Sequence, residues 1–559
     1  MLRFSGPRPE WKLILFFYVL MAFTALAFFQ GIARAALDGM DPTVEELGEP
    51  EPVIDFGMSH VEARARDLAS RPFQDTAGGV PEYLLRISYD QWRDIRFKPE
   101  KSLWRKEGLP FELQFFHPGL FYNKMVSINI VTQEGVKELP FSTEFFNYGE
   151  NDFQARVASA KLSFAGFRVH YPLNKPDYKD EVAVFLGASY FRAVGKGLQY
   201  GLSARGIALD TALPSGEEFP FFQEFWIVKP GNKSTKLTIY ALLNSPSCTG
   251  AYKFLIIPGT ETVLIVNSTV FLRKDVAKVG IAPLTSMFMF GETENGMPGD
   301  YRPEVHDSDG LLVKASDGTY FWRPLANQRR LGISKFKGNN LQGFGLLQRD
   351  QVFDHYQDLE ARYEMRPSLW IEPTGKWGGG HVELIEIPSD KEINDNIVAF
   401  WVPAKKVETG PDGKPLPVKP DAFKEPKRFS YVMRWMKHSD ESLPVATAVA
   451  TRLAKGKGDK YRRFIIDFEG ADINALPAET GLASEVTVGE GARLVEKQLQ
   501  KNEVTGGWRL AFEILLEQRE DLKSAFIDTQ RVIKLSALIK KGDNIPDPLS
   551  VTWTYHLQP

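Results

Sequence analysis

The chain contains very little cysteine and histidine. Its 559 residues include one cysteine, Cys248, which excludes a disulfide within the chain and any metal cluster built from cysteines. We expect Cys248 to be a small buried hydrophobic residue, with a catalytic thiol as the alternative. The eight histidines include no HExxH motif and no i, i+4 pair, so the sequence predicts no metal site.

The chain also has no excess of basic over acidic residues. Lysine and arginine number 68 against 71 acidic residues, which gives a net charge of -3. Nucleic-acid binding needs a concentrated basic surface, so the composition predicts no nucleic-acid partner. The glycine-rich stretch GKGLQYG, Gly195 to Gly201, lacks the spacing of a dinucleotide fingerprint, and no G-x-S-x-G elbow of a serine hydrolase occurs.

The N-terminus has the pattern of an export signal. Arg3, Arg8 and Lys12 precede an apolar run from Leu13 to Phe29, and small residues follow at Ala33–Ala35. The absence of an adjacent arginine pair in this segment favours the general export route. An uncleaved membrane anchor is the alternative, because the run is longer than the ~7–15 residues of a usual signal core.

We therefore expect a signal peptide over 1–35, cleaved near Ala35, and an acidic tether over 36–54. The rest of the chain is then expected outside the cytoplasm, where ATP and nicotinamide cofactors are scarce. An activity that needs no cofactor follows from this placement.

The rest of the sequence contains many short segments that are typical of β-strands. Segments such as VSINIVTQ, KLTIYALL, FLIIPG, TVLIVNSTVFLR and HVELIEI are rich in Val, Ile, Thr and Phe and are bounded by Gly, Pro, Asn and Asp. Only two stretches favour helices, SHVEARARDLASR and VFDHYQDLEARYE, the second with Phe353, Tyr356, Leu359 and Tyr363 at helical spacing. The sequence therefore predicts an all-β fold.

A stretch rich in proline, lysine and glycine between Pro403 and Pro426 interrupts the strands. Such a segment cannot hold a continuous ladder, so we interpret 404–426 as a linker. This places a large N-terminal domain over 55–403 and a smaller one over 427–559. The second strand series, from FSYVMRWMKH to SVTWTYHL, has the length of one immunoglobulin-like β-sandwich.

Acidic and aromatic residues gather in two places. DYRPEVHDSDG combines Tyr301, Arg302 and His306 with several acids, and TYFWRPL with Trp322 follows shortly after. A glycine run next to Trp377 would let a ligand approach the backbone. Aromatic faces cover the apolar face of a sugar, while charged groups bind its hydroxyls, so we interpret these residues as carbohydrate-binding. The alternative for each tryptophan is core packing.

Several long blocks then resemble one known family. They are SYDQWRDIRFKPEKSLW, LPFELQFFHPGLFY, LTSMFMFGE, DYRPEVHDSDGL, FGLLQRDQVFDHYQDLEARYEMRPSLWIEP, GKWGGGHVELIEIPSDKEINDNIVAFW and GGWRL. In these blocks the chain resembles the OpgG/OpgD (MdoG/MdoD) family of periplasmic glucan biosynthesis proteins. Export through the general route favours the G-type over the D-type.

The resemblance implies a fold, an activity and partners. The N-terminal domain is expected to be a β-sandwich like that of galactose mutarotases. The substrate is expected to be a β-1,2-linked glucan, cleaved or transferred by an inverting glycoside hydrolase or transglycosylase. A membrane glucan synthase and a second copy in a homodimer are the implied protein partners, and the compartment is the periplasm.

The resemblance also assigns site residues. Asp395 matches the general acid, Asp307 matches the residue that receives the proton of the attacking water, and Glu392 matches a supporting acid. Asn394 and Asn396 flank Asp395 and are expected to orient it or to bind sugar hydroxyls. The alternative is that these residues merely form a tight turn before a strand, which Asp and Asn do well.

Two classes of function remain open at this point. The chain is either a glycan-cleaving or glycan-transferring enzyme, or a non-catalytic glucan-binding factor that assists the synthase. An inverting enzyme would place the carboxyl groups of Asp395 and Asp307 ~6.5–9.5 Å apart in one cleft, or further if waters relay the proton.

Overall fold

A computed structural model describes residues 55–75, 79–294, 296–405, 425–438, 443–517, 532–542 and 548–559. The expected signal peptide (1–35), the acidic tether (36–54) and most of the expected linker (404–426) lie outside these residues. Within the described ranges, the helices are all too short or too polar to cross a membrane.

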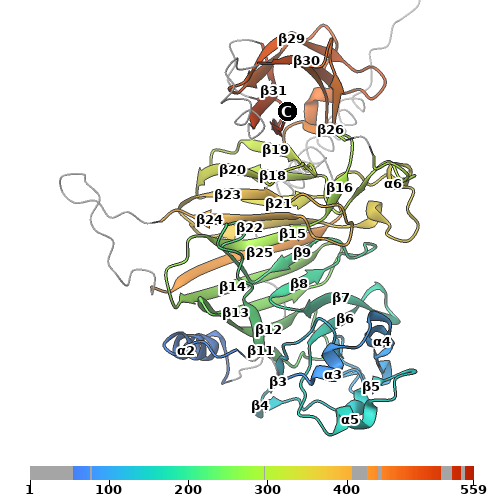
Figure 1. The fold of residues 1–559 in the computed structure, drawn as a ribbon, viewed down its shortest axis with the longest axis vertical. Coiled ribbons are helices and arrows are strands. Elements are labelled where there is room, and N and C mark those ends of the chain that lie inside the picture. Colours follow the sequence, from blue (N-terminus) through green and yellow to red (C-terminus); the bar gives the residue numbers. More distant parts are fainter. Residues whose placement is uncertain are drawn as a thin grey trace, which may run out of the picture. The chain divides into compact units, whose positions relative to one another are not determined.

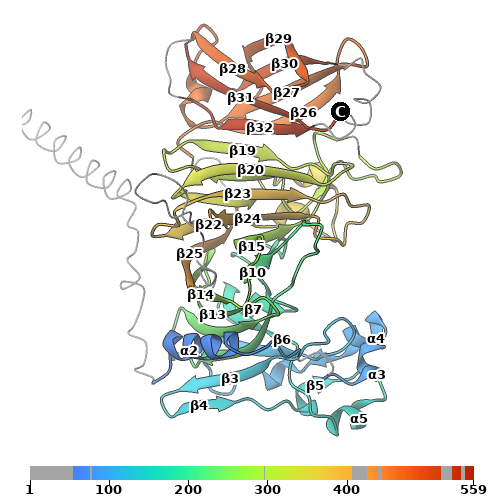
Figure 2. The same ribbon diagram turned by 60° about the vertical axis from the view of Figure 1, so that its left-hand side comes forward.

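The structure is nearly all β, as the sequence predicts, and two large sheets dominate it (Figures 1 and 2). The 10-stranded sheet contains, in spatial order, β2 (Glu112–Phe116), β6 (Gly166–Lys175), β7 (Tyr178–Leu186), β8 (Tyr190–Ala193), β9 (Ser203–Arg205), β15 (Val279–Ser286), β24 (Ile397–Pro403), β23 (Gly379–Glu386) and β20 (Gly332–Asn339), with β10 (Ile207–Leu209) paired to β15.

The 14-stranded sheet runs through both halves of the chain. Its order is β28 (Leu482–Val488), β31 (Ile533–Lys541), β32 (Thr552–Leu557), β19 (Tyr320–Pro324), β18 (Gly310–Lys314), β21 (Gly343–Leu347), β22 (Ser368–Thr374), β25 (Lys427–Met436), β14 (Thr262–Leu272), β13 (Cys248–Ile257), β12 (Leu237–Asn244), β11 (Phe221–Val228), β3 (Ser127–Thr132) and β4 (Gly135–Glu138).

The remaining elements are smaller. A 4-stranded sheet contains β26 (Thr447–Lys455), β27 (Tyr461–Glu469), β30 (Trp508–Leu516) and β29 (Ala492–Lys501). Two short pairs are β1 (Arg96–Phe97) with β5 (Phe146–Asn147), and β16 (Phe288–Phe290) with β17 (Val305–His306). The helices are α2 (Met58–Ala69), α3 (Glu82–Leu85), α4 (Tyr89–Asp94), α5 (Gln154–Ala158) and α6 (Phe353–Tyr356), with 3-10 turns η1 (Pro99–Lys101), η2 (Thr143–Phe145), η3 (Tyr363–Met365) and η6 (Ala471–Ala475).

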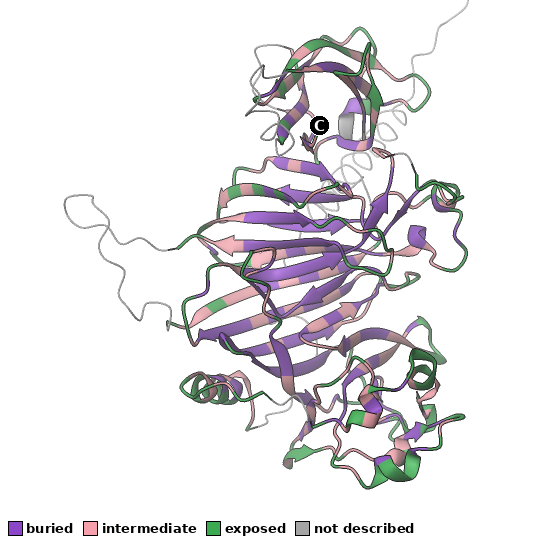
Figure 3. Cartoon of the chain, in the orientation of Figure 1, coloured by how far each residue is buried: buried purple, intermediate pink, exposed green. Residues whose placement is uncertain are grey.

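Aromatic side chains fill the space between the two large sheets. Phe185 and Phe191 of the 10-stranded sheet lie 5.3 and 5.2 Å, ring centre to ring centre, from Phe254 of the 14-stranded sheet. Figure 3 shows buried residues following the strands of both sheets, with exposed residues gathered at turns and short helices. The two sheets therefore form a β-sandwich with one continuous apolar core.

Helix α2 explains why β12 is apolar along its whole length. One face of β12 points into the sandwich, and the other is covered by α2, whose Val61 and Ala65 pack with Trp226 and Tyr240. Both faces are thus buried, which produces the continuous hydrophobic run LTIYALL instead of an alternating pattern. The predicted helix SHVEARARDLASR is confirmed as α2.

The C-terminal part forms a second, smaller sandwich. Its seven strands lie in the 4-stranded sheet and in β28, β31 and β32, and Phe464 packs on Phe512 and Trp553 at 5.1 and 5.7 Å. Two packed sheets of this size confirm an all-β sandwich here, and the immunoglobulin-like assignment of this domain stays a prediction. The β28–β31–β32 sheet continues into the 14-stranded sheet, because β32 pairs in parallel with β19.

The expected domain boundary at residue 427 lies too early. Strand β25 pairs with β14 on one side and β22 on the other, so it belongs to the large sandwich. The reason is its alternation: Tyr431, Met433 and Trp435 are buried in the core of that sandwich. A strand beyond the linker therefore returns to the N-terminal domain.

The second expected helix, VFDHYQDLEARYE, is wrong as a continuous element. Helix α6 ends at Tyr356 because Gln357 has φ 57°, and Arg362 also has a left-handed φ of 46°. Between them the carboxylate of Asp358 accepts the backbone N–H groups of Glu360 and Ala361, at 2.9 and 2.8 Å. This local hydrogen bonding competes with the helix and leaves a loop.

Candidate functional site

Asp307 is a buried carboxylate between β17 and β18. Its side chain is 7% exposed and forms an ion pair with the Arg366 guanidinium, while its backbone N–H donates to the Met287 carbonyl at 2.8 Å. Burial raises the pKa of Asp307; Arg366 opposes the rise and the charge of Asp395 adds to it. A base with a raised pKa that stays paired with an arginine is suited to accepting a proton.

Asp395 lies in the loop between β23 and β24, two residues before β24 begins, and is exposed. Its charge acts on the buried Asp307 and on the partly buried Tyr190. Burial is the main cause of the raised pKa of Tyr190, which lies on β8. The loop of Asp395, the start of β18 and strand β8 therefore converge on one site, although the separation of the two carboxyl groups stays a prediction.

The two asparagines beside Asp395 have different environments. Asn396 is 2% exposed, and its amide binds the backbone N–H and C=O of Phe288 at 2.8 and 2.9 Å. It ties the loop to β16 and has no surface for a sugar hydroxyl, so its expected binding role is wrong. Asn394 is exposed and donates to the Ser389 hydroxyl at 3.3 Å, which leaves its substrate role a prediction.

Glu392 is held by two donors. The Tyr363 hydroxyl donates to its carboxylate, and Arg302 donates to both of its oxygens at 3.1 and 2.9 Å. Burial opposes the ionisation of Glu392, but the hydrogen bonds from Arg302 and Tyr363 outweigh it and lower the pKa. Glu392 is thus an anion in the loop that carries Asp395.

Tyr301 and His306, both expected to bind sugar, have opposite environments. Tyr301 is 74% exposed, so its ring is available to a ligand. His306 is fully buried, and its Nε2 and Nδ1 atoms contact Glu304 Oε2 and Gln348 Oε1, each at 2.9 Å. Because both ring nitrogens are occupied inside the protein, the expected role of His306 in sugar binding is wrong.

The two expected tryptophans belong to the core. Trp322 is 2% exposed, with the Arg349 guanidinium 3.6 Å from its ring centre. Trp377 is 8% exposed and packs edge-on against Phe429 and Tyr431 at 5.6 and 5.8 Å. Neither ring has a free face for a pyranose, so the alternative reading of core packing holds for both.

The burial of Cys248 decides between its two expected roles, a small buried hydrophobic residue and a catalytic thiol. It is 0% exposed, and burial raises the pKa of its thiol to about 12. A thiol in this environment is not a nucleophile near neutral pH. The expectation of a small buried hydrophobic residue is therefore confirmed.

Sequence reasoning missed Arg366, Tyr363 and Tyr190 as site residues. Tyr363 was interpreted as part of a helical core stripe, whereas its hydroxyl reaches Glu392. Arg366 lies just after it and pairs with Asp307, 59 positions earlier in the chain. The available signal was that both residues fall inside one of the long blocks that resemble a known family.

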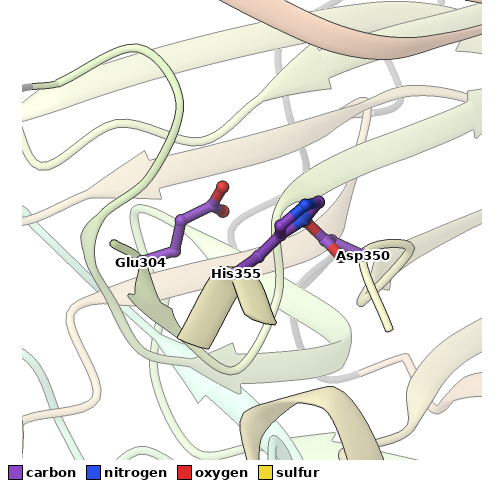
Figure 4. Close-up of side chains that lie close together, drawn as sticks. All are labelled: Glu304, Asp350 and His355. Atoms are coloured by element: carbon purple, nitrogen blue, oxygen red, sulfur yellow. The ribbon is translucent and has the colours of Figure 1, made fainter. Parts of the chain in front are cut away.

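One group of side chains has the composition of a metal site. Glu304, Asp350 and His355 bring their ligand atoms within 4.8 Å of one another (Figure 4). His355 Nδ1 is already hydrogen-bonded to Asp350 Oδ2 at 2.5 Å, and Glu304 to His306. Each of the three groups thus has at least one hydrogen-bond partner within the protein.

The site gathers carboxylates, arginines and tyrosines in a β-sandwich, and these groups can form hydrogen bonds with hydroxyl-rich ligands. Comparison with known proteins makes this specific. The family model described as "Periplasmic glucan biosynthesis protein, MdoG" matches residues 56–557, and the chain belongs to this family.

Individual relatives agree with the family assignment. "Glucans biosynthesis protein G" of Ralstonia nicotianae is 44% identical over 522 residues, which cover 92% of this chain and 98% of that protein. A solved polysaccharide lyase matches 68% of this chain and 43% of its own, with 10% identity and a TM-score of 0.16. That structural likeness is too low to carry an argument.

Proposed function

We propose that this protein acts in the periplasm on the β-1,2-linked backbone of periplasmic glucans, as an inverting glycoside hydrolase or transglycosylase. Asp395 is the general acid that protonates the leaving oxygen. Asp307 is the group that receives the proton of the attacking water. Glu392 supports the site as a fixed anion, and no cofactor takes part.

The observation that carries the proposal is the contrast between the two aspartates. Asp307 is buried and paired with Arg366, whereas Asp395 is exposed on a loop and is still close enough to influence the pKa of Asp307. Inverting glycosidases need two carboxyl groups in one site, one that donates a proton and one that activates water. Because Asp395 is exposed, donation requires that the bound glucan shields it from water.

The non-catalytic binding factor remains the second candidate, and the exposure of Asp395 favours it. A binding factor needs partners for sugar hydroxyls but no carboxyl group that is held protonated. In this case Tyr301 and Asn394 would contact the glucan while Asp395 serves as one more hydrogen-bond acceptor.

Incubation of the exported form with linear β-1,2-glucan separates the two candidates. We expect shortened or transferred products, identified by mass spectrometry, and inverted anomers by NMR. Asp395→Asn and Asp307→Asn should each lower turnover by about 10²–10⁴-fold and leave glucan binding intact. Asp390→Asn is the matched control, because Asp390 is an exposed acid in the same loop. Binding by the wild type without any product would support the binding factor.

The location and protein partners have their own tests. In this proposal the signal is removed near Ala35, so the mature chain begins near Ala36 and is released into the periplasm. Mass spectrometry of the periplasmic fraction would detect this N-terminus, whereas an intact N-terminus on membrane-bound protein would contradict it. Light scattering tests for a homodimer, and co-purification with the membrane fraction tests for contact with a glucan synthase.

A further inference from the structure

Every donor of the Arg302 side chain is already used inside the protein. A guanidinium has five N–H donors. Nε donates to Asp300 Oδ1 at 3.0 Å, and Nη2 donates to Asp300 Oδ2 and Glu392 Oε2 at 2.7 and 2.9 Å. Nη1 donates to Asp358 Oδ2 and Glu392 Oε1 at 2.9 and 3.1 Å. No donor is left for a sugar hydroxyl, although the sequence suggested that Arg302 binds substrate.

The three carboxylates that surround Arg302 come from three separate segments. Asp300 precedes β17, Asp358 lies in the loop between α6 and η3, and Glu392 lies in the loop between β23 and β24. The Arg302 side chain is 15% exposed, and those of Asp300 and Asp358 are 17% and 12% exposed. Bidentate hydrogen bonds between an arginine and carboxylates are charge-assisted, and at a partly buried site they hold the partner side chains in a defined geometry.

The branch through Asp358 leads to Asp307. The other oxygen of Asp358 accepts the backbone N–H groups of Glu360 and Ala361. The Ala361 carbonyl in turn accepts from Arg366 Nε and Nη2, at 3.2 and 3.1 Å. Arg366 uses its remaining Nη1 for the ion pair with Asp307. Arg302 therefore supports the arginine that pairs with the expected base.

The branch through Glu392 leads to Asp395. Glu392 lies three residues before Asp395 in the same loop, and its Oε1, which accepts from Arg302 Nη1, also accepts from the Tyr363 hydroxyl. Tyr363 belongs to η3, the turn that precedes Arg366. The loop of the expected acid and the segment of the expected base are thus joined through the guanidinium of Arg302, in addition to the direct hydrogen bond from Tyr363 to Glu392.

We propose that Arg302 is a positioning residue, which holds the Asp395 loop and the 358–366 segment in one arrangement and does not contact the glucan. This inference rests on the proposed function for its kinetic consequence, but its structural content is independent of it. One arginine faces three carboxylates, so its removal leaves three neighbouring negative charges that repel one another. The two segments would lose this shared link and keep the Tyr363–Glu392 hydrogen bond, so we expect both to become more mobile.

Hydrogen exchange tests the structural content on the full exported chain. Arg302→Gln should speed amide exchange about tenfold or more in 358–366 and 387–396, because both segments lose a shared partner. Arg302→Lys keeps the charge with three donors and should show a smaller effect. It replaces the Gln variant if that variant fails to fold.

Arg434→Gln is the matched control. Arg434 lies on β25 of the 14-stranded sheet and pairs with Glu261 and Glu372, so its replacement should leave both segments unchanged. Unchanged exchange in both Arg302 variants would overturn the inference, whatever the activity.

Kinetics on linear β-1,2-glucan test the consequence. A displaced acid lowers kcat, and we expect Arg302→Gln to reduce it about 10–100-fold while KM changes less than about threefold. The acidic limb of the pH profile should move to higher pH, because Glu392 loses the cation that keeps it ionised. A raised KM with unchanged kcat would show that Arg302 binds sugar and would overturn the inference. An inactive wild type would instead refute the proposed function, and the exchange measurement would then decide the role of Arg302 alone.

Discussion

The guanidinium of Arg366 pairs with the carboxylate of Asp307, although the two residues lie 59 positions apart in the chain. Burial raises the pKa of Asp307, and Arg366 opposes this rise. The ion pair thus lowers the pH at which Asp307 becomes ionised, against the effect of burial. If Asp307 accepts a proton during turnover, Arg366 sets the acidic limit of activity.

Replacing Arg366 by methionine tests this relationship. The pKa of Asp307 should rise further, because burial then acts without a cation, and more alkaline conditions are needed to ionise the carboxyl group. The acidic limb of the kcat/KM profile should therefore move to higher pH, and the fold should lose about 3 kcal/mol at neutral pH from the unpaired buried carboxylate. Arg366→Lys should retain most of both properties. An unshifted limb in the methionine variant would separate Asp307 from the catalytic proton transfer.

His306 gives the fold a pH dependence of its own. Burial by itself lowers the pKa of His306, but the hydrogen bond and charge of Glu304 outweigh it and raise the pKa to about 9. A raised pKa in the folded state stabilises the fold fully below the unfolded value of ~6.5, and this stabilisation is lost as the pH rises through about 9. Urea unfolding at pH 6 and pH 9.5 should differ by about 3 kcal/mol from this group.

The His306→Gln variant is the control for that difference. Glutamine keeps a donor toward Glu304 but does not titrate, so the contribution of this position should no longer depend on pH. An equal pH dependence in the variant and the wild type would assign the effect to other groups.

The strands were predictable because their physical signal is local. In β14, β23 and β32, β-branched and aromatic residues recur between turn residues, and each was expected close to its observed range. Fold class and the smaller sandwich follow from such patterns. The place of β25 did not follow, because strand pairing depends on which core accepts Tyr431 and Trp435, and that is a long-range property.

The site was predictable only in part, for a related reason. Asp307, Asp395 and Glu392 come from the resemblance to a family, whereas the residues around Asp395 by themselves favour a tight turn. The sequence places Trp322 and His306 at the site because aromatic and basic residues beside acids are common in sugar sites, but both side chains are buried in the interior. Arg366 could not be found from spacing, since its partner is distant in sequence.

Core packing around Trp322 gives a stability prediction. A Cβ added at Gly310 would lie 2.0 Å from Trp322 Cη2, which is impossible without movement of a ring that is 2% exposed. Gly310→Ala should therefore lower the free energy of unfolding by about 1–3 kcal/mol or more. Trp322→Ala should cost about 3–5 kcal/mol and leave glucan affinity nearly unchanged in the folded fraction.

Denaturant unfolding and calorimetric glucan titration measure these two effects. Gly318→Ala is the matched control for the steric clash, because no atom lies within 4 Å of a Cβ built at Gly318. The φ of 88° at Gly318 adds backbone strain to this variant. Loss of glucan binding in a fully folded Trp322→Ala variant would restore Trp322 as a ligand-binding residue.

Strand β25 predicts how the protein behaves when its chain is cut after β24. The proline-rich sequence of 404–426 should accept an inserted protease site, and cleavage there would place β25 on the C-terminal fragment. Because β25 pairs along its length with both β14 and β22 and buries Trp435 in the core, the two fragments should stay associated after cutting. They should elute together in size-exclusion chromatography, keep the wild-type circular dichroism spectrum and separate only in denaturant.

Cleavage between β26 and β27, by contrast, would interrupt the smaller sandwich alone. Two folded fragments that separate in buffer would show that the pairing of β25 with the large sheet is dispensable, and would return the domain boundary to residue 427.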